Sequence, residues 1–583
     1  MHHRHRLRLS SALLAATCSL AVWTASPAPA EAFCGFYVAG ADSKLFNDAT
    51  MVVLMRDGKR TVLAMQNAYQ GPPEDFAMVV PVPVVLSEDN VKTLPREVFD
   101  RVDKLAAPRL VEYWEQDPCN PWVDLPEPTA AFGRGGGGVE YEADGAADDG
   151  VVIEAQFTVA EYEIVILSAN DSTGLDNWLN KNGYKIPAGS EPLLRPYVED
   201  GMKFFVAKVD VEKVKFESRP DGSKAATLSP LRFHYDSDEF SLPIRLGLIN
   251  APGDAPDGPN APDAKAGGAQ DLLVHVLARG DRYQVANYPN VTIPTNLDVK
   301  DSVREHFGEF YVSLFDHTLA QTPKAIVTEY AWSASSCDPC PEPALTLAEL
   351  VTLGADVLPS YAGKLDQQQI DSDLEWSVPS EFVLTRLHAR YDQSSLGEDL
   401  VFETASGIAG GREFLTDGKQ LEQGSQPSTV NQFQARYAIR HKWEGKVDCK
   451  EPQYGIWGGP PSDRDQKPTP TVARQLAAAP RGGSLASFVT ADASAQLGVA
   501  AVDEPPTEPA ANEPDPAKPE PAGEEPTGKA PASTPDTASK PKSPGGCACA
   551  IDEGQEGDGA PGRGLGLGLL ALLTLAGVRR KRD

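Results

Sequence analysis

Short runs that alternate apolar and polar residues fill most of the chain between residues 34 and 457, and such alternation is typical of half-buried β-strands. Runs rich in β-branched and aromatic residues predict strands over 50–55, 60–65, 78–83, 203–211, 228–235, 242–249, 271–277, 325–332, 382–390 and 434–440, with one or two more within 151–167. Asp57-Gly58, between the first two runs, is typical of a hairpin turn.

Helical periodicity is limited to a few segments. After Pro95, four apolar residues recur at the spacing of one helix face and predict a helix over 96–105. Apolar residues at the same spacing predict a second helix over 176–182, which ends at Gly183. Because regular strand–helix–strand alternation is missing, the chain is predicted to be an α+β protein, with mixed, mostly antiparallel sheets and a few helices.

Three stretches carry too few apolar groups to form a core. Residues 133–150 and 251–268 are rich in Gly, Ala, Asp and Pro and are predicted to be surface insertions, either of which can mark a subdomain boundary. Pro, Ala, Glu and Thr dominate 459–546, apart from an apolar patch around 485–499, and no core is expected there. We therefore expect an exported globular domain over 33–458, followed by a disordered linker that acts as a stalk.

The N-terminus has the organisation of a secretory signal. Three arginines precede an apolar run over 9–23, and small residues at 28–32 offer a cleavage site. We therefore expect residues 1–32 to direct export and to be removed. Export also implies an oxidising compartment, in which cysteines pair.

The C-terminus, 547–583, has the organisation of a sorting signal. Cys547 and Cys549 precede a Gly-rich stretch, a hydrophobic helix over 565–578 and a basic tail. An apolar run of roughly 14 residues rises only about 21 Å, against a hydrocarbon core of about 30 Å, and is a poor permanent anchor. The basic tail consists of Arg579, Arg580, Lys581 and Arg582.

This order of cysteine motif, hydrophobic helix and Arg-rich end resembles the C-terminal sorting domain of myxobacterial surface proteins, the MYXO-CTERM type. The resemblance implies cleavage near the cysteines by an intramembrane sorting protease. It also implies display at the cell surface or outer membrane, with membrane attachment through the C-terminal helix before processing.

The charge balance argues against nucleic acid as a partner. The chain has 83 acidic and 53 basic residues, a formal net charge of −30. A protein that neutralises phosphates needs an excess of Lys and Arg, so the acidic surface is interpreted as an aid to solubility.

The exported body has an odd number of cysteines. They are Cys34, Cys119, Cys337, Cys340 and Cys449. Two bridges among five cysteines can form in about 15 ways and leave one thiol over. Cys337 and Cys340 can pair with each other, or each can pair with Cys119 or Cys449.

The C-x-x-C motif from Cys337 to Cys340 has three interpretations: a structural disulfide, half of a zinc site, or a redox dithiol. Two prolines delay the next helix to near Thr346, too late for its dipole to activate Cys337. Zinc would need Cys119, Cys449 or a histidine to converge on the motif. The structural disulfide is therefore favoured, and no metal, cofactor or catalytic residue is predicted.

Other polar candidates have plainer explanations. The histidines are His234, His275, His306, His317, His388 and His441, and none forms an H-E-x-x-H motif. Acidic residues at Asp236, Asp238 and Glu239, and at Glu74 and Asp75, are expected in solvated turns rather than in a calcium site or ligand site. Trp114, Trp122, Trp178, Trp332 and Trp376 are expected in the core, although a surface cluster of them could bind a glycan.

The body contains six short sequence motifs that can be compared with known families. They are CGFYV from Cys34, MQNAYQGPPEDFAMVVPVP over 65–83, APRLVEYW from Ala107, LDNWLNKNGYKIP over 175–187, CDPC from Cys337 and TRLHARYD from Thr385. They resemble those of an uncharacterised bacterial family, domain-of-unknown-function family 2330. The resemblance implies an exported, often surface-anchored protein and transfers no catalytic residue, because the family has none assigned.

These features favour a cell-surface protein whose body is a non-enzymatic binding or structural module of the envelope, with an unspecified ligand. Its expected partners are the export machinery, the sorting protease and the membrane. The alternative is an extracytoplasmic enzyme, either a thiol oxidoreductase using Cys337 and Cys340 or a hydrolase of envelope polymers.

Overall fold

In the computed structural model the chain consists of two units, residues 1–505 and 506–583. Every described helix and strand lies in the first unit. The described residues are 36–37, 49–66, 77–120, 147–148, 151–182, 184, 190–218, 224–249, 270–365, 370, 381–391, 395–413, 421–464, 470–473 and 481–500. The signal over 1–32, the insertion over 251–268, the linker beyond 500 and the sorting tail lie outside them, and 133–150 is described only at Ala147–Asp148.

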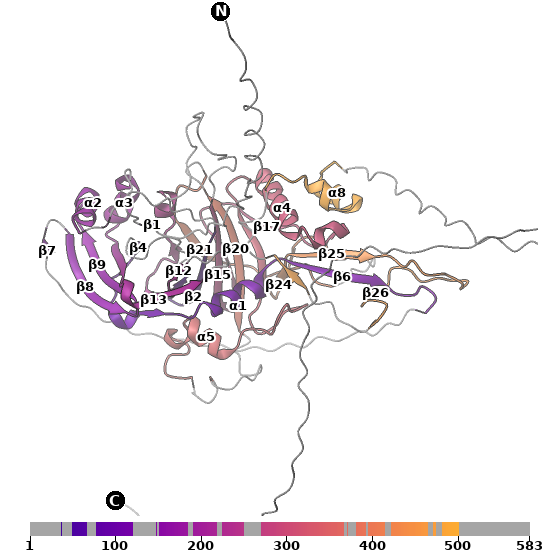
Figure 1. The fold of residues 1–583 in the computed structure, drawn as a ribbon, viewed down its shortest axis with the longest axis horizontal. Coiled ribbons are helices and arrows are strands. Elements are labelled where there is room, and N and C mark those ends of the chain that lie inside the picture. Colours follow the sequence, from indigo (N-terminus) through magenta and orange to yellow (C-terminus); the bar gives the residue numbers. More distant parts are fainter. Residues whose placement is uncertain are drawn as a thin grey trace, which may run out of the picture. The chain divides into compact units, whose positions relative to one another are not determined.

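An 11-stranded mixed sheet forms the centre of the described fold (Figure 1). Its strand order is β23-β22-β24-β19-β20-β15-β2-β3-β13-β5, with β17 beside β19. The strands are β2 (Ala49–Asp57), β3 (Arg60–Met65), β5 (Val91–Thr93), β13 (Leu231–Asp236), β15 (Gln270–Arg279), β17 (Asn290–Thr292), β19 (Ile326–Ser333), β20 (Phe382–Tyr391), β22 (Ile408–Gly410), β23 (Gln426–Pro427) and β24 (Gln432–Gln434). The fold is α+β, as predicted, since helices flank antiparallel and mixed sheets rather than alternating with strands.

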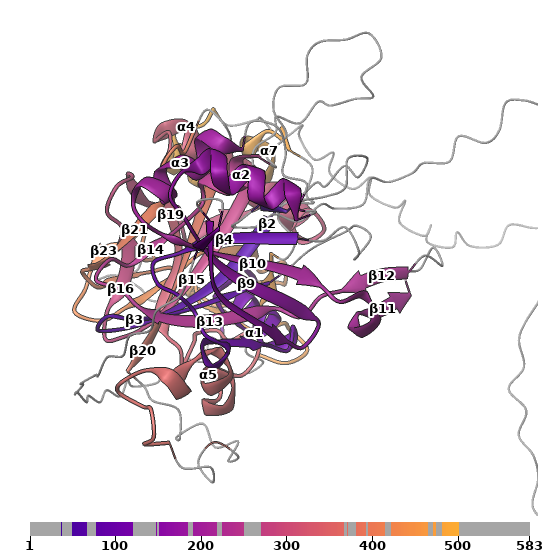
Figure 2. The same ribbon diagram turned by 90° about the vertical axis from the view of Figure 1, so that its left-hand side faces the viewer.

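A six-stranded antiparallel sheet packs on one face of the large sheet. Its strands, in order, are β1 (Phe36–Tyr37), β4 (Ala77–Val82), β10 (Lys203–Val209), β9 (Tyr162–Ala169), β8 (Val151–Val159) and β7 (Ala147–Asp148). Ile164 and Phe205 meet Leu54 and Val274 in the core between the two sheets. Helices α2 (Ser172–Lys181) and α3 (Glu191–Glu199) lie side by side and cover its outer face (Figure 2).

Two helices lie on the opposite face of the large sheet. Apolar residues of α1 (Glu97–Ala106) and α5 (Leu347–Leu353) pack on alternate positions of β2, β15 and β20. The predicted helical face of α1 is confirmed, because Phe99, Val102 and Leu105 are fully buried. Thr346 accepts from the Glu349 backbone N–H and caps the start of α5, as the sequence indicated.

A smaller five-stranded sheet carries the C-terminal part of the body. It contains β18 (Leu297–Val299), β25 (Arg436–His441), β6 (Arg109–Glu115), β26 (Trp457–Gly458) and β27 (Thr471–Val472). Helix α4 (Phe307–Gln321) packs between this sheet and β19, and helices α7 (Leu485–Phe488) and α8 (Ala491–Leu497) close the same core.

The packed body therefore extends past 458, where the sequence pattern placed its end. Leu485, Phe488 and Val489 are buried in the core that α4 forms, so the expectation that no core forms around 485–499 is wrong. This apolar patch is too short to make a core by itself, but the side of α4 that the sheets leave uncovered packs against it.

The remaining strands form two small sheets: β11 (Lys215–Ser218) with β12 (Lys224–Thr227), and β14 (Ser241–Leu242), β21 (Leu400–Ala405) and β16 (Arg282–Val285). The strand predicted over 242–249 is wrong, because the chain turns into a 3-10 helix over Arg245–Ile249. Among the described residues, no helix is both long and apolar enough to cross a membrane.

Candidate functional site

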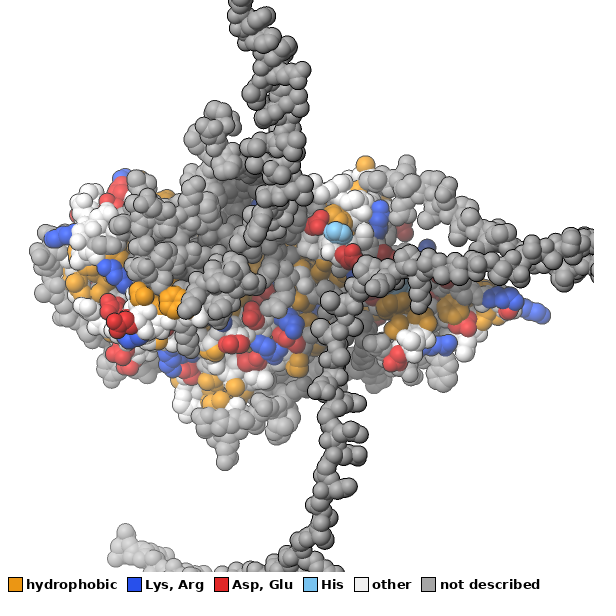
Figure 3. Space-filling model, in the orientation of Figure 1, with side chains coloured by type: hydrophobic (Ala, Val, Ile, Leu, Met, Phe, Trp, Pro, Cys, Tyr) orange, Lys and Arg blue, Asp and Glu red, His pale blue; other side chains and the backbone are white. Residues whose placement is uncertain are grey.

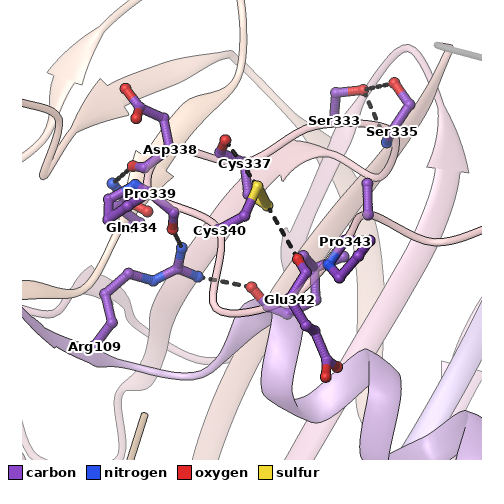
Figure 4. The surroundings of a disulfide bond; sticks show 12 residues. Arg109, Ser333, Ser335, Cys337, Asp338, Pro339, Cys340, Glu342, Pro343 and Gln434 are labelled. Carbon is purple, nitrogen blue, oxygen red and sulfur yellow. Dashed lines mark hydrogen bonds between the residues drawn. A yellow bond between two sulfur atoms is a disulfide. The ribbon is translucent and has the colours of Figure 1, made fainter. Parts of the chain in front are cut away.

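The described cysteines form two disulfides. Cys119, beyond the end of β6, is bonded to Cys449, 330 residues away, with a Cα–Cα distance of 5.5 Å. Cys337 is bonded to Cys340, with a Cα–Cα distance of 5.0 Å, and closes a tight loop between β19 and α5 (Figure 4). Both distances are normal for disulfides. Cys34 lies outside the described residues.

Two buried side chains donate hydrogen bonds to the loop from Cys337 to Cys340. Arg109 on β6 donates from Nη1 to the Pro339 carbonyl at 2.8 Å, and Gln434 on β24 donates from Nε2 to the Asp338 carbonyl (Figure 4). The peptide bond before Pro339 is cis. The carbonyls of Asp338 and Pro339 face Gln434 and Arg109, whereas Asp338 and Cys340 are exposed residues.

The surroundings of this loop do not favour a reactive thiolate. The first N–H groups of α5 are capped by Thr346 and Glu349, so they are not directed at Cys337. Sγ of Cys340 lies 3.0 Å from the carbonyl oxygen of Cys337, and a negative sulfur there would face a negative dipole. Among the described residues, no three His, Cys, Asp or Glu side chains cluster at metal-binding distance.

The structure separates the histidines into exposed and buried groups. His306, His317 and His441 contact Glu309, Gln321 and Glu112 respectively on partly exposed faces of the molecule. His234 on β13 contacts Asn90 at 3.2 Å. His275 and His388, on neighbouring strands, are buried, with 0% and 2% of their surfaces exposed.

His388 belongs to a buried ionic cluster that the sequence did not indicate. Its Nδ1 lies 2.6 Å from Oε1 of Glu329 on β19, and its Nε2 lies 3.2 Å from Oδ1 of Asp271 on β15. Nε of Arg386 donates to the other Glu329 oxygen at 2.6 Å. The Tyr311 hydroxyl on α4 also donates to Glu329.

The cluster continues from this centre toward two surfaces. On one side Arg386 contacts Asp103 of α1. On the other side Asp271 accepts from Arg390 and Arg481, and Arg390 also contacts Asp316, whose side chain is 39% exposed. A continuous chain of charged groups therefore runs from α1 along one face of the sheet to α4.

Strand periodicity explains how these side chains meet. Arg386, His388 and Arg390 alternate along β20, so all three point to the face that α1 and α4 cover. Asp271 pairs with Arg390 in the register of β15 and β20. A bulge in β19 between residues 328 and 330 brings Glu329 to the same face.

The charges in the cluster balance only if His388 is protonated. The carboxylates are Asp103, Asp271, Asp316 and Glu329, and the cations are Arg386, Arg390, Arg481 and His388. Burial alone would lower the pKa of His388, but Glu329 and Asp271 outweigh it and raise that pKa. Burial would likewise raise the pKa values of Asp271 and Glu329, yet their cationic partners hold both below the usual range.

His275, next to the cluster, is different. Burial and the neighbouring Arg386 lower the pKa of His275 to about 3, so its ring is neutral. Neither ring nitrogen makes a hydrogen bond of standard geometry with the described residues. Glu329 and Arg386 are 0% and 1% exposed, so the centre of the cluster is closed to a substrate.

The acidic turn after β13 is occupied by salt bridges. Asp236 contacts Arg60 at 2.7 Å, and Asp238, which is 86% exposed, contacts Lys59 at 2.7 Å. On the face drawn in Figure 3, acidic side chains are interspersed with basic ones. Glu74 and Asp75 lie outside the described residues.

Three of the tryptophans expected in the core, Trp114, Trp178 and Trp332, belong to different parts of the fold. Trp114 stacks on His441 with ring centroids 4.7 Å apart, Trp178 stacks on Tyr184, and Trp332 is buried between the large sheet and its helices. Trp122 and Trp376 lie outside the described residues. Trp114, Trp178 and Trp332 therefore form no common surface for a glycan with one another.

Comparison with known proteins gives one match. Residues 28–403 match the model of a family described as "Uncharacterized protein conserved in bacteria (DUF2330)". The matched region contains β19, β15, β20 and the disulfide loop, whereas β24, β25 and the C-terminal helices follow it. No curated protein and no solved structure matches the chain.

Proposed function

The chain belongs to this DUF2330 family, and we propose that it is an exported protein displayed at the cell surface, where its body serves as a non-enzymatic binding or structural module of the envelope. The observation that carries the proposal is the disulfide between Cys119 and Cys449. Cytosolic thiols are kept reduced, so a structural bridge between distant segments suits an oxidising compartment outside the cytoplasm.

The arrangement of ionisable groups supports the non-enzymatic part of the proposal. The best-connected group, around Glu329 and His388, is buried and internally paired. A catalytic acid or base must reach the proton that it transfers, and the polar contacts of Glu329 and His388 with described residues all lie within the cluster. The cluster is therefore suited to fixing β15, β19, β20 and α4 against each other.

The disulfide loop also favours a non-enzymatic module over a thiol oxidoreductase. The capped start of α5 and the carbonyl oxygen beside Cys340 Sγ provide no stabilisation for a thiolate at either cysteine. A dithiol catalyst would need such stabilisation to attack a substrate disulfide.

Surface display rests on the two terminal signals and can be tested at the C-terminus. Replacing the basic tail from Arg579 to Arg582 with glutamines should abolish sorting, because positive charge holds this end on the cytoplasmic side. The measurement is labelling of intact cells with an antibody to the body.

A matched control carries glutamines at Lys446 and Arg464, two exposed residues of the body, and should be displayed normally. Equal surface labelling of the tail variant and the wild-type protein would contradict the assignment of the tail as a sorting signal.

A further inference from the structure

The last described segment of the body, residues 481–500, forms a strap that lies against helix α4 and strand β18 (Figure 1). It contains α7 and α8, which have four and seven residues. Its apolar side chains are buried in the core that α4 forms: Leu485, Phe488, Val489, Ala493 and Leu497. The strap therefore covers an apolar surface of the body.

Polar contacts fasten the strap at both ends. Near its start, the Ser313 hydroxyl on α4 donates to the Gly483 carbonyl at 3.1 Å. At its end, Nε2 of His317 lies 3.1 Å from the Leu497 carbonyl oxygen. One isolated bridge joins its middle to β18. The last strand of the sheets, β27, ends at Val472, so the strap can leave without breaking any strand pairing within them.

The strap is suited to open as one unit. Helices of four and seven residues are too short to persist in water without tertiary contacts, so α7 and α8 should lose their structure together when they leave α4. No described helix or strand follows the strap in sequence, and residues 506–583 form a separate unit. Its opening therefore pulls no other described element away from the body.

One ion pair links the strap to the buried ionic cluster. Arg481 donates from Nη2 to Oδ2 of Asp271 at 3.0 Å. The side chain of Asp271 is 4% exposed, accepts from Arg390, and lies 3.2 Å from Nε2 of His388. The positive charges of Arg481 and His388 therefore share one carboxylate and repel each other.

The other members of the cluster stay in place when the strap leaves, because they belong to the sheet and to the helices of the body. Those around His388 include Glu329 of β19, Arg386 and Arg390 of β20, and Tyr311 and Phe315 of α4. Opening removes Arg481 alone, so three cations remain beside four carboxylates.

We propose that residues 481–500 open and close on α4 as a unit, and that the contact between Arg481 and Asp271 couples this movement to the charge of the buried cluster. In the closed state Arg481 opposes the proton on His388. In the open state the apolar surface around Phe310 is uncovered, and the remaining cluster holds that proton more tightly. This device goes beyond surface display and does not depend on where the protein is located.

Hydrogen exchange of the full-length protein, followed by mass spectrometry of peptides, tests the opening. Peptides of the strap should exchange together and faster than peptides of β15 and β20, which exchange only when the large sheet unfolds. Arg481→Gln should speed exchange of the strap by about two- to fivefold, because it removes one part-buried ion pair. Gln496→Ala, at an exposed position of the strap, is the matched control and should leave its exchange unchanged.

Titration of the His388 ring tests the coupling. It is followed by NMR in the full-length protein labelled with isotope-enriched histidine, and His388→Gln identifies the signal. Arg481→Gln should raise the pKa of His388 further, because a cation leaves the surroundings of the ring, and Arg481→Lys should restore the wild-type value. Phe488→Ala should also raise this pKa, although it changes no charge, because the opened strap carries Arg481 away.

If Phe488→Ala fails to fold by circular dichroism, Leu497→Ala, a smaller truncation in the same strap, takes its place. Three results would each overturn the proposal: a strap that exchanges no faster than β20, exchange of the strap that Arg481→Gln leaves unchanged, or a pKa of His388 that stays at the wild-type value in the folded strap variant.

Discussion

Individual residues of the buried cluster depend on one another for neutrality. Glu329 contacts Arg386, His388 and Tyr311 at once, and its side chain is fully buried. A buried ion pair adds little net stability compared with an apolar replacement, but removing one partner leaves the others charged and unsatisfied. Single substitutions should therefore be far more damaging here than at the surface.

We expect Glu329→Gln to lower the free energy of unfolding by about 3–5 kcal/mol, because Arg386 and His388 lose their common carboxylate. Urea unfolding measures the change. Asp238→Asn is the control: it breaks a salt bridge whose side chains are 68% and 86% exposed, and it should change stability by no more than about 1 kcal/mol. Equal effects of both substitutions would show that the cluster is not structural.

The raised pKa of His388 predicts a loss of stability at alkaline pH. Because the native state holds this proton more tightly than the unfolded chain, the stabilisation is fully present below pH of about 6.5 and is lost as pH rises through the native pKa. His388→Gln should therefore lower the thermal midpoint most at low pH, and the difference from wild type should shrink as pH rises. The same scan of His306→Gln, at a half-exposed site, is the control. A constant difference for His388→Gln would contradict a protonated ring.

At the scale of elements, strands could be predicted well and helix α4 could not. Strands β2, β3, β15 and β20 lie where alternation placed them, since one face of each packs against the six-stranded sheet. Helix α4 is buried around most of its circumference, by β19, the small sheet and α7, and so lacks the polar face that reveals a helix.

The ionic cluster was missed for a related reason. Charged residues at alternate positions of β20 suggest a solvent face, and their partners Glu329 and Asp271 are 57 or more residues away in sequence. Only the strand order of the sheet and the bulge in β19 bring them together. The alternation of apolar and polar residues therefore predicts where the strands lie. The buried ionic cluster depends on contacts between distant segments, which that alternation does not encode.

The packing of α7 and α8 gives a prediction at this scale. A chain that ends at 500 should be as stable as the full chain, whereas one that ends at 483 uncovers the core around Phe310. The loss of buried Leu485, Phe488 and Val489 should cost several kcal/mol, at about 1.5–3 kcal/mol for each large apolar side chain. Thermal unfolding of both truncations is the measurement. Equal midpoints would mean that these helices do not contribute to the core.

At the scale of the whole molecule, the terminal signals, the disulfides and the family membership support our proposal of an exported body, closed by bridges, that is delivered to the cell surface. The excess of acidic residues fits this proposal, since it favours solubility and opposes binding of nucleic acid.

Mass spectrometry of the intact, unreduced protein isolated from the producing cells tests the central claim of export and display most directly. The account predicts a chain that begins near residue 33 and ends near Cys547 or Cys549, with Cys119 bonded to Cys449 and Cys337 bonded to Cys340. A chain that runs from Met1 to Asp583 with free thiols would contradict it.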